Sequence, residues 1–136
     1  MVDTLSRDFG QGFLEEAYEG VRGGQVAQIL DSPIFPQAPT QRFILTDYAQ
    51  TLNVLDQYGL RARAVYQVPR TGSYRCYISG DDHSELWLKQ SSGARSCIAS
   101  SLSWTGFAEF NKYSSQQSEP IALNAGEEIE IEILLK

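Results

Sequence analysis

The C-terminal stretch of the chain constrains the fold more than any other segment. From residue 128 to residue 135, apolar residues of one parity (Ile129, Ile131, Ile133, Leu135) alternate with Glu128, Glu130, Glu132 and Leu134. Successive side chains of a β-strand point to opposite faces of a sheet, whereas a helix repeats every 3.6 residues. The glutamates would be poor as a buried helix face. The stretch therefore predicts a strand with one apolar face and one wet face, on an edge or in a half-covered sheet.

Other segments show the same alternation or a strand-like composition. We predict strands over Tyr58–Val68, Ser73–Ser79, Glu85–Lys89 and Ser96–Ser100, with a hairpin turn at Pro69–Gly72 joining the first two. Many short strands separated by turns predict an all-β fold, an antiparallel β-sandwich. Two N-terminal segments are less regular. Phe13–Tyr18 fits a strand or a short helix, and three prolines make Ser32–Pro39 an irregular loop.

Length and charge limit the classes of partner. The 136 residues predict a single domain over 1–136, and the net charge of −6 argues against nucleic acid and against anionic membrane surfaces. No apolar run approaches membrane-spanning length, so we expect no membrane insertion. The cysteines, Cys76 and Cys97, are too few for a disulfide framework, and the lone His83 excludes a multi-histidine metal site.

The residues from Pro69 to Leu88 read PRTGSYRCYISGDDHSELWL. This stretch is similar, almost position by position, to the pattern P-x-T-G-x-Y-x-F-x-I-x-x-D-D-x-S-E-L-W-L of the PA14 family, a β-sandwich domain of adhesins, glycosidases, glycosyltransferases and cell-surface proteins. Further matches follow the same order along the chain, at Gly12–Tyr18, Ser32–Pro36, Tyr58–Arg63, Trp104–Thr105, Lys112–Tyr113, Gln116–Ser118 and Ala125–Gly126.

The chain departs from the family pattern in two ways. Cys76 stands where the family usually has an aromatic residue, and the sequence stops at Lys136, before the final strand that the family usually has. A missing final strand would leave the last strand at an open sheet edge, which is a pairing liability. We therefore expect the N-terminal arm, residues 1–11, or another copy of the chain in a homo-oligomer to pair with this C-terminal edge.

Asp81 and Asp82 are the sharpest functional feature. On local sequence alone, Gly80–Asp82 is an ordinary turn between two strands. In carbohydrate-binding PA14 members, consecutive aspartates at this position share a cis peptide and hold a calcium ion that coordinates sugar hydroxyls. The resemblance therefore implies Ca²⁺ as a cofactor, with Asp81 and Asp82 as metal ligands. Calcium takes six to eight oxygen ligands, so further ligands are needed.

Other residues near the pair have two interpretations each. Gln116 and Gln117 are candidate ligand-binding residues or sheet-surface amides, and His83 is a sugar contact or an exposed turn residue. Trp104, beside a turn, is a candidate to stack on a sugar ring. Trp87 is expected in the core because it lies inside a strand. Glu85 belongs to that strand and is expected to satisfy neighbouring donors rather than to form a glycosidase carboxylate pair, so we predict no enzyme.

Two functions remain open on these observations. One is a calcium-dependent carbohydrate-binding module, lectin- or adhesin-like, that binds a glycan outside the cell or at its surface. The alternative is a structural or protein-interaction PA14 module of a larger surface protein or glycoside-processing enzyme, without calcium or sugar.

Overall fold

The computed structural model describes residues 13–45, 57–91, 93–106 and 108–136. The strands are β1 (Phe13–Glu19), β2 (Gln41–Leu45), β3 (Tyr58–Gln67), β4 (Gly72–Tyr74), β5 (Ser84–Lys89), β6 (Ser96–Ser101), β7 (Ile121–Leu123) and β8 (Glu128–Leu135). A short helix α2 (Val26–Leu30) and the 3₁₀ turn η1 (Ser114–Gln116) complete the described elements. The all-β prediction is confirmed, and Phe13–Tyr18 is a strand rather than a helix. None of the described helices is long and apolar enough to cross a bilayer.

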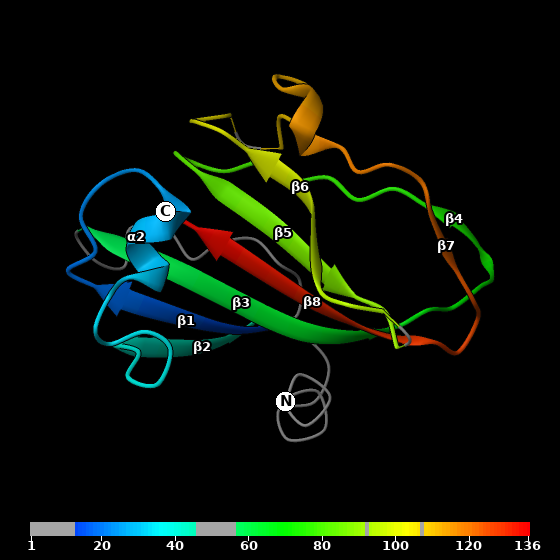
Figure 1. Ribbon diagram of the computed structural model, residues 1–136, viewed down its shortest axis with the longest axis horizontal. Coiled ribbons are helices and arrows are strands. Elements are labelled where there is room, and N and C mark those ends of the chain that lie inside the picture. The colour runs from blue at the N-terminus through cyan, green and yellow to red at the C-terminus, as the bar shows by residue number, and fades with distance from the viewer. Residues whose placement is uncertain (1–12, 46–56, 92, 107) are drawn as a thin grey trace.

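Six strands form one antiparallel sheet in the order β2-β1-β3-β8-β5-β6 (Figure 1). β8 lies in the middle of this sheet, with β3 on one side and β5 on the other. The prediction that the C-terminal strand lies at an open edge is therefore wrong, and so is the reason for expecting strand pairing there. The backbone groups of β8 are already paired on both sides. Residues 1–11, the expected N-terminal arm, lie outside the described residues.

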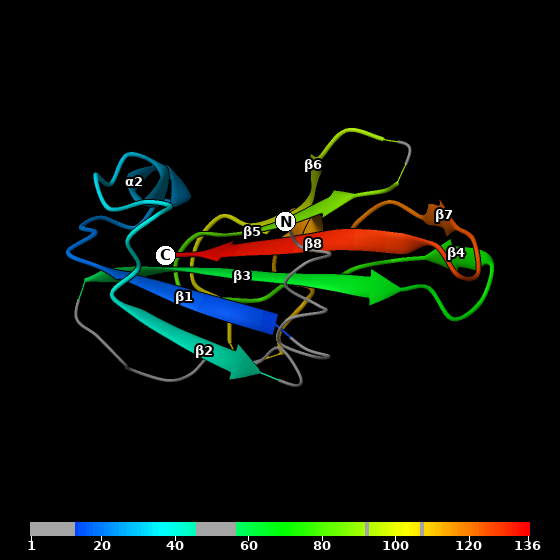
Figure 2. The same ribbon diagram turned by 90° about the horizontal axis from the view of Figure 1, so that it is seen from below.

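One face of the sheet carries the main apolar core. It is built from residues of a single parity on each strand, including Ala17, Leu60, Ala62, Leu86, Ile133 and Leu135. A thin second layer packs on this face. The β4–β7 pair packs at one end of it, where Leu123 lies against Leu88 and Ile129, and the segments next to β4 and β7 in the chain are joined by the Tyr77–Gln117 bridge. Ile78 packs onto the sheet from the segment that follows β4. The view in Figure 2 shows the β4–β7 pair beyond one end of the large sheet.

The second layer is less regular than the sequence predicts. Of the expected Ser73–Ser79 strand, only Ser73 and Tyr74 lie in a strand, β4, which pairs with β7. The turn at Pro69–Gly72 therefore does not close a hairpin between β3 and β4. It carries the chain from the six-stranded sheet to the second layer instead.

The opposite, outer face of the sheet is covered at one end by α2 and the proline-rich loop (Figure 1). Tyr18, Val21 and Ile29 form a small buried cluster there, with Ile34 and Phe35 against it. The Tyr18 hydroxyl donates a hydrogen bond to the Pro36 carbonyl at 3.0 Å, and its ring lies 5.1 Å from that of Phe35. The predicted irregular loop at Ser32–Pro39 is confirmed, and it has a defined packing role.

Gly59 is the point where α2 packs directly on the backbone of β3. A Cβ at this position would meet the Cγ1 and Cδ1 atoms of the buried Ile29 well inside van der Waals contact. We expect Gly59→Ala to lower the free energy of unfolding by ~1–3 kcal/mol, because Ile29 cannot move without disturbing its cluster. Gly72→Ala is the matched control, since its Cβ would have no atom within 4 Å. Chemical denaturation measures both, and equal stability of the two variants would contradict this packing.

Candidate functional site

Asp81 and Asp82 line a small pocket at the end of the sheet where β8 terminates. The pocket encloses about 210 Å³ and also contains Tyr58, Leu135 and Lys136. Both aspartates are exposed. Burial lowers the pKa of the Lys136 ammonium group, and the nearby Asp82 carboxylate partly opposes that shift. The pocket therefore holds two carboxylates and one amine, a polar set suited to hydroxyl-bearing ligands.

The two carboxylates could hold a calcium ion only together with further oxygen ligands. Asp81 and Asp82 offer at most about four carboxylate oxygens, whereas calcium takes six to eight oxygens. Across the described part of the chain, no group of three His, Cys, Asp or Glu residues could hold a metal. The Asp81–Asp82 peptide is not cis, contrary to the implication of the resemblance, and Asp82 adopts a φ of 60°. The other ligands of an ion here would have to be backbone, water or sugar oxygens.

His83 is not the exposed turn residue of the local interpretation, because it is half-buried and its ring contacts α2 and Glu85. Its Nδ1 accepts a hydrogen bond from the Val26 N–H at 3.0 Å, at the first residue of α2. Because Nδ1 is an acceptor, the ring proton of the neutral form lies on Nε2, 3.5 Å from a Glu85 carboxylate oxygen. Glu85 also accepts from the Trp87 indole at 3.0 Å. The predicted structural role of Glu85 agrees with these contacts.

Gln116 and Gln117 have different environments. Gln116 is fully buried, and its Nε2 donates to the Ile78 and Glu109 carbonyls at 2.9 and 2.6 Å. Its Oε1 accepts from the Tyr113 N–H at 2.7 Å. The amide is therefore occupied by backbone groups and is not available to a ligand. Gln117 is exposed, and its side-chain amide donates to the Phe110 carbonyl at 3.2 Å.

Trp104 lies at the same end of the molecule as the aspartates. The next residue, Thr105, donates its backbone N–H to the Gly80 carbonyl at 2.8 Å, which ties the loop to the residue before Asp81. The Trp104 side chain is 53% exposed, and the Lys112 ammonium lies 4.9 Å from its ring centroid. Trp104 is thus an exposed aromatic side chain on a loop tied to Gly80, but it is not among the residues that line the pocket.

Sequence reasoning missed a larger groove on the outer face of the sheet. It encloses about 410 Å³ over β3, β8 and β5, and its lining includes Phe35, Arg61, Arg63, Trp87, Arg95 and Glu132. Trp87 therefore faces this groove, and its predicted place in the core is wrong. The alternation along β5 indicates this orientation. Leu86 and Leu88 are buried on the core face, so the side chain of Trp87, which lies between them, points to the outer face.

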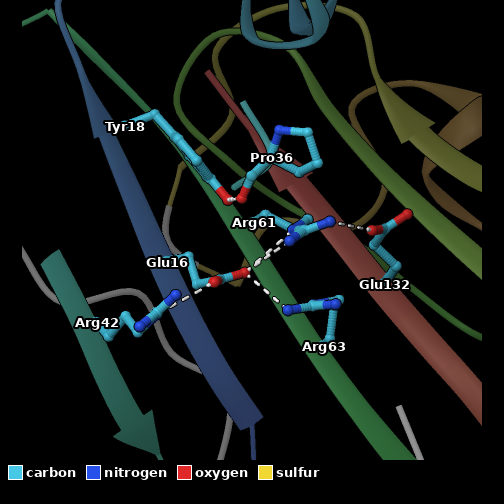
Figure 3. A network of polar contacts seen from close by, with 7 residues as sticks. All are labelled: Glu16, Tyr18, Pro36, Arg42, Arg61, Arg63 and Glu132. Atoms are coloured by element: carbon cyan, nitrogen blue, oxygen red, sulfur yellow. Dashed lines mark hydrogen bonds and ion pairs between the residues drawn. The ribbon is translucent and has the colours of Figure 1, made fainter. Parts of the chain in front are cut away.

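A nearly buried carboxylate organises the arginines under the groove (Figure 3). The Glu16 side chain is 3% exposed, and its Oε1 accepts from Arg61 at 2.9 and 3.1 Å and from Arg63 at 3.0 Å. Its Oε2 accepts from Arg42 at 3.4 Å. Arg61 also lies 3.8 Å from Glu132, which forms an ion pair with Arg95. Fixed guanidinium groups of this kind bind carboxylate, sulfate or phosphate oxygens well.

Comparison with known proteins gives one relative of known activity. The chain is 32% identical over 125 residues to a mouse protein, N-acetyl-beta-glucosaminyl-glycoprotein 4-beta-N-acetylgalactosaminyltransferase 1. The alignment covers 88% of this chain but spans only 12% of the mouse protein. No family model matches the chain. No solved structure matches it either.

This similarity corrects the prediction of no enzyme. The mouse relative is named as a glycosyltransferase, and nearly the whole of this chain aligns with a part of it. The prediction failed because it considered only carboxylate pairs within the chain. A region of this size can belong to a transferase even when a glycosidase-type carboxylate pair is not expected in it.

Gln116 yields a prediction that separates structural from ligand-binding roles. Gln116→Leu removes both donors and the acceptor and leaves the Ile78 and Glu109 carbonyls and the Tyr113 N–H without this partner. We expect a loss of about 2 to 4 kcal/mol in the free energy of unfolding, since unpaired buried polar groups are costly. Gln117→Leu, at the exposed neighbour, should change it by under about 0.5 kcal/mol. Thermal denaturation of both variants checks this, and a stable Gln116→Leu protein would refute the structural role.

Proposed function

We propose that this chain binds carbohydrate as a region of a glycan-modifying protein. The observation that carries the proposal is its similarity, over 88% of its length, to a transferase whose name places its reaction on glycoprotein sugars. The resemblance of Pro69–Leu88 to the PA14 pattern supports the same ligand class. Under this proposal the chain works outside the cell or at its surface, where a glycan-binding PA14 domain would meet its ligands.

The pocket at Asp81 and Asp82 is the proposed site of binding. Its two carboxylates would hold a calcium ion, which supplies open coordination positions for sugar hydroxyl oxygens when it is bound. Lys136 lies in the same pocket and can donate hydrogen bonds to a ligand hydroxyl. The exposed Trp104 ring, on the loop tied to Gly80, would offer an apolar surface to the C–H face of a sugar that extends from the pocket.

Structural residues around the pocket hold it in place. Thr105 donates its hydroxyl to the Gly80 carbonyl at 3.0 Å and accepts from the Gly80 N–H at 2.8 Å. On the other side, the Lys136 backbone N–H donates to the His83 carbonyl at 2.9 Å. The turn that carries the two aspartates is therefore fastened at both of its ends. A fixed turn lowers the entropy lost on ligand binding.

Calcium titration tests this proposal directly. The ion should raise the free energy of unfolding by ~2.7 kcal/mol at a hundredfold excess over its dissociation constant, because only the folded state binds it. Asp82→Asn should remove most of this stabilisation and weaken glycan binding by at least about tenfold, since an essential anionic ligand is lost. Glu128→Gln, an exposed carboxylate at the other end of β8, is the control with the same change of charge.

Differential scanning fluorimetry and a glycan array, each with calcium and with chelator, give the two readouts. A melting temperature unaffected by calcium would remove the ion from the proposal. An array on which no glycan is bound under either condition would reject carbohydrate binding itself and favour a protein-docking role. Equal effects of Asp82→Asn and Glu128→Gln would show that only net charge matters.

A further inference from the structure

We propose that the groove on the outer face of the sheet is a second binding site, for a glycan that carries a carboxylate or a sulfate group. The groove is formed by β3, β8 and β5 and differs in place and in chemistry from the pocket at Asp81 and Asp82. It shares only its ligand class with the function proposed above. It needs neither calcium nor the aspartates.

The groove has the charge of an anion site. Among the described residues, three guanidinium groups that line the groove, those of Arg61, Arg63 and Arg95, pair with two carboxylates, Glu16 and Glu132. Lys89 and Glu130, which also line the groove, form an ion pair with each other. The groove therefore has an excess of one positive charge, in a chain whose net charge is −6. An excess of guanidinium over carboxylate in a partly buried place leaves donors that a bound anion can satisfy.

The arginines of the floor are held in fixed positions before any ligand arrives. Glu16 accepts two hydrogen bonds from Arg61 and one from Arg63, and both side chains are largely buried, with 12% and 21% exposed. The Arg63 Nε–H is buried and has no hydrogen-bond partner among the described residues. Glu16 alone thus does not satisfy Arg63. A buried donor without an acceptor is costly in a purely structural network, and a bound ligand that accepts from it would account for it.

The walls of the groove suit a sugar ring. Trp87 and Phe35 supply aromatic surface on its two sides, and each ring has a guanidinium over it, Arg95 at 4.0 Å and Arg61 at 5.1 Å from the respective centroids. The neighbouring Leu30 is 52% exposed. Aromatic and apolar walls take the C–H face of a pyranose, while the arginines take its anionic group. A volume of about 410 Å³ is in the range of small-molecule pockets.

The surrounding charge favours a single anionic group over a polyanion. Glu130 and Glu132 also line the groove, and Glu85 lies next to Trp87 on the same face of β5. A nucleic-acid backbone would bring repeated charges against these carboxylates and against the acidic chain as a whole. A sugar with one carboxylate or sulfate places its charge on the arginines alone.

Binding of small sugars to the ¹⁵N-labelled chain, followed by NMR, tests the proposal. The probes are glucuronic acid, N-acetylglucosamine 6-sulfate and their uncharged parents, glucose and N-acetylglucosamine, with inorganic sulfate as the test of charge alone. We expect at least one anionic sugar to bind about tenfold more tightly than its parent and than sulfate, with shifts at Trp87, and to bind more weakly in high salt. The first two probes distinguish a carboxylate from a sulfate.

Variants of three arginines test whether the anionic sugar binds in the groove. Arg95→Gln changes a rim residue that is 45% exposed, and it leaves the contacts of Glu16 intact. It should weaken binding of the anionic sugar about tenfold without a change in melting temperature. Arg63→Gln should weaken it further. Arg42→Gln is the matched control, because Arg42 also pairs with Glu16 but is 61% exposed and does not line the groove.

Three results would overturn the inference. The first is equal binding of the anionic sugars and their parents, or no binding of either anionic sugar. The second is an Arg42→Gln variant that loses as much affinity as Arg95→Gln, which would indicate a network that only supports the fold. The third is self-association that Arg95→Gln abolishes, which would make the groove a protein interface. Asp82→Asn should leave the anionic sugar bound, so failure of the calcium proposal is seen separately.

Discussion

The pairing of β8 with both β3 and β5 is the contact on which the rest of the structure depends. β1 and β2 reach β5 and β6 only through β3 and β8, so the six-stranded sheet is two smaller sheets joined by the C-terminal strand. Eight residues of β8 pair with β3, from Leu60–Leu135 to Gln67–Glu128, and six pair with β5. The two faces of β8 also have different roles. Its isoleucines enter the core, while Glu130 and Glu132 line the groove.

Alternation in the sequence predicts which way a side chain points, but not which strand lies beside it. The period-two pattern of residues 128–135 correctly gave a strand with an apolar and a polar face. An edge strand and a central strand with one polar face share this pattern. The open edge was expected because the final strand of the PA14 pattern is missing, and it is wrong because β8 pairs with both β3 and β5. Trp87 shows the same lesson at one residue. Its place inside an apolar strand suggested the core. Because Trp87 alternates with the buried Leu86 and Leu88, its side chain points to the other face, into the groove.

The candidate sites were predicted where they rest on neighbouring residues and missed where they rest on distant ones. Asp81 and Asp82 were singled out because they are consecutive and belong to the Pro69–Leu88 stretch that resembles the PA14 pattern. The groove depends on Glu16 meeting Arg61 and Arg63, residues 45 and 47 positions away in the sequence. Only strand order and register bring them together. Buried glutamines such as Gln116 are equally hard to foresee, because the backbone groups that they satisfy belong to three separate turns and strands.

The segment from Gly24 to Phe35 borders both candidate sites, and this shapes how they can act together. At one end, a Cβ on Gly24 would lie 3.7 Å from an Asp82 carboxylate oxygen, and the Val26 N–H bonds to His83. At the other end, Phe35 forms a wall of the groove under the guanidinium of Arg61. Two strands of the sheet connect the sites as well, because Leu60 of β3 and Leu135 of β8 line the pocket, whereas Arg61 and Glu132 on the same two strands line the groove. An influence of one site on the other can therefore pass along these strands or through this short segment, whose buried Ile29 and close packing on Gly59 hold it against the sheet.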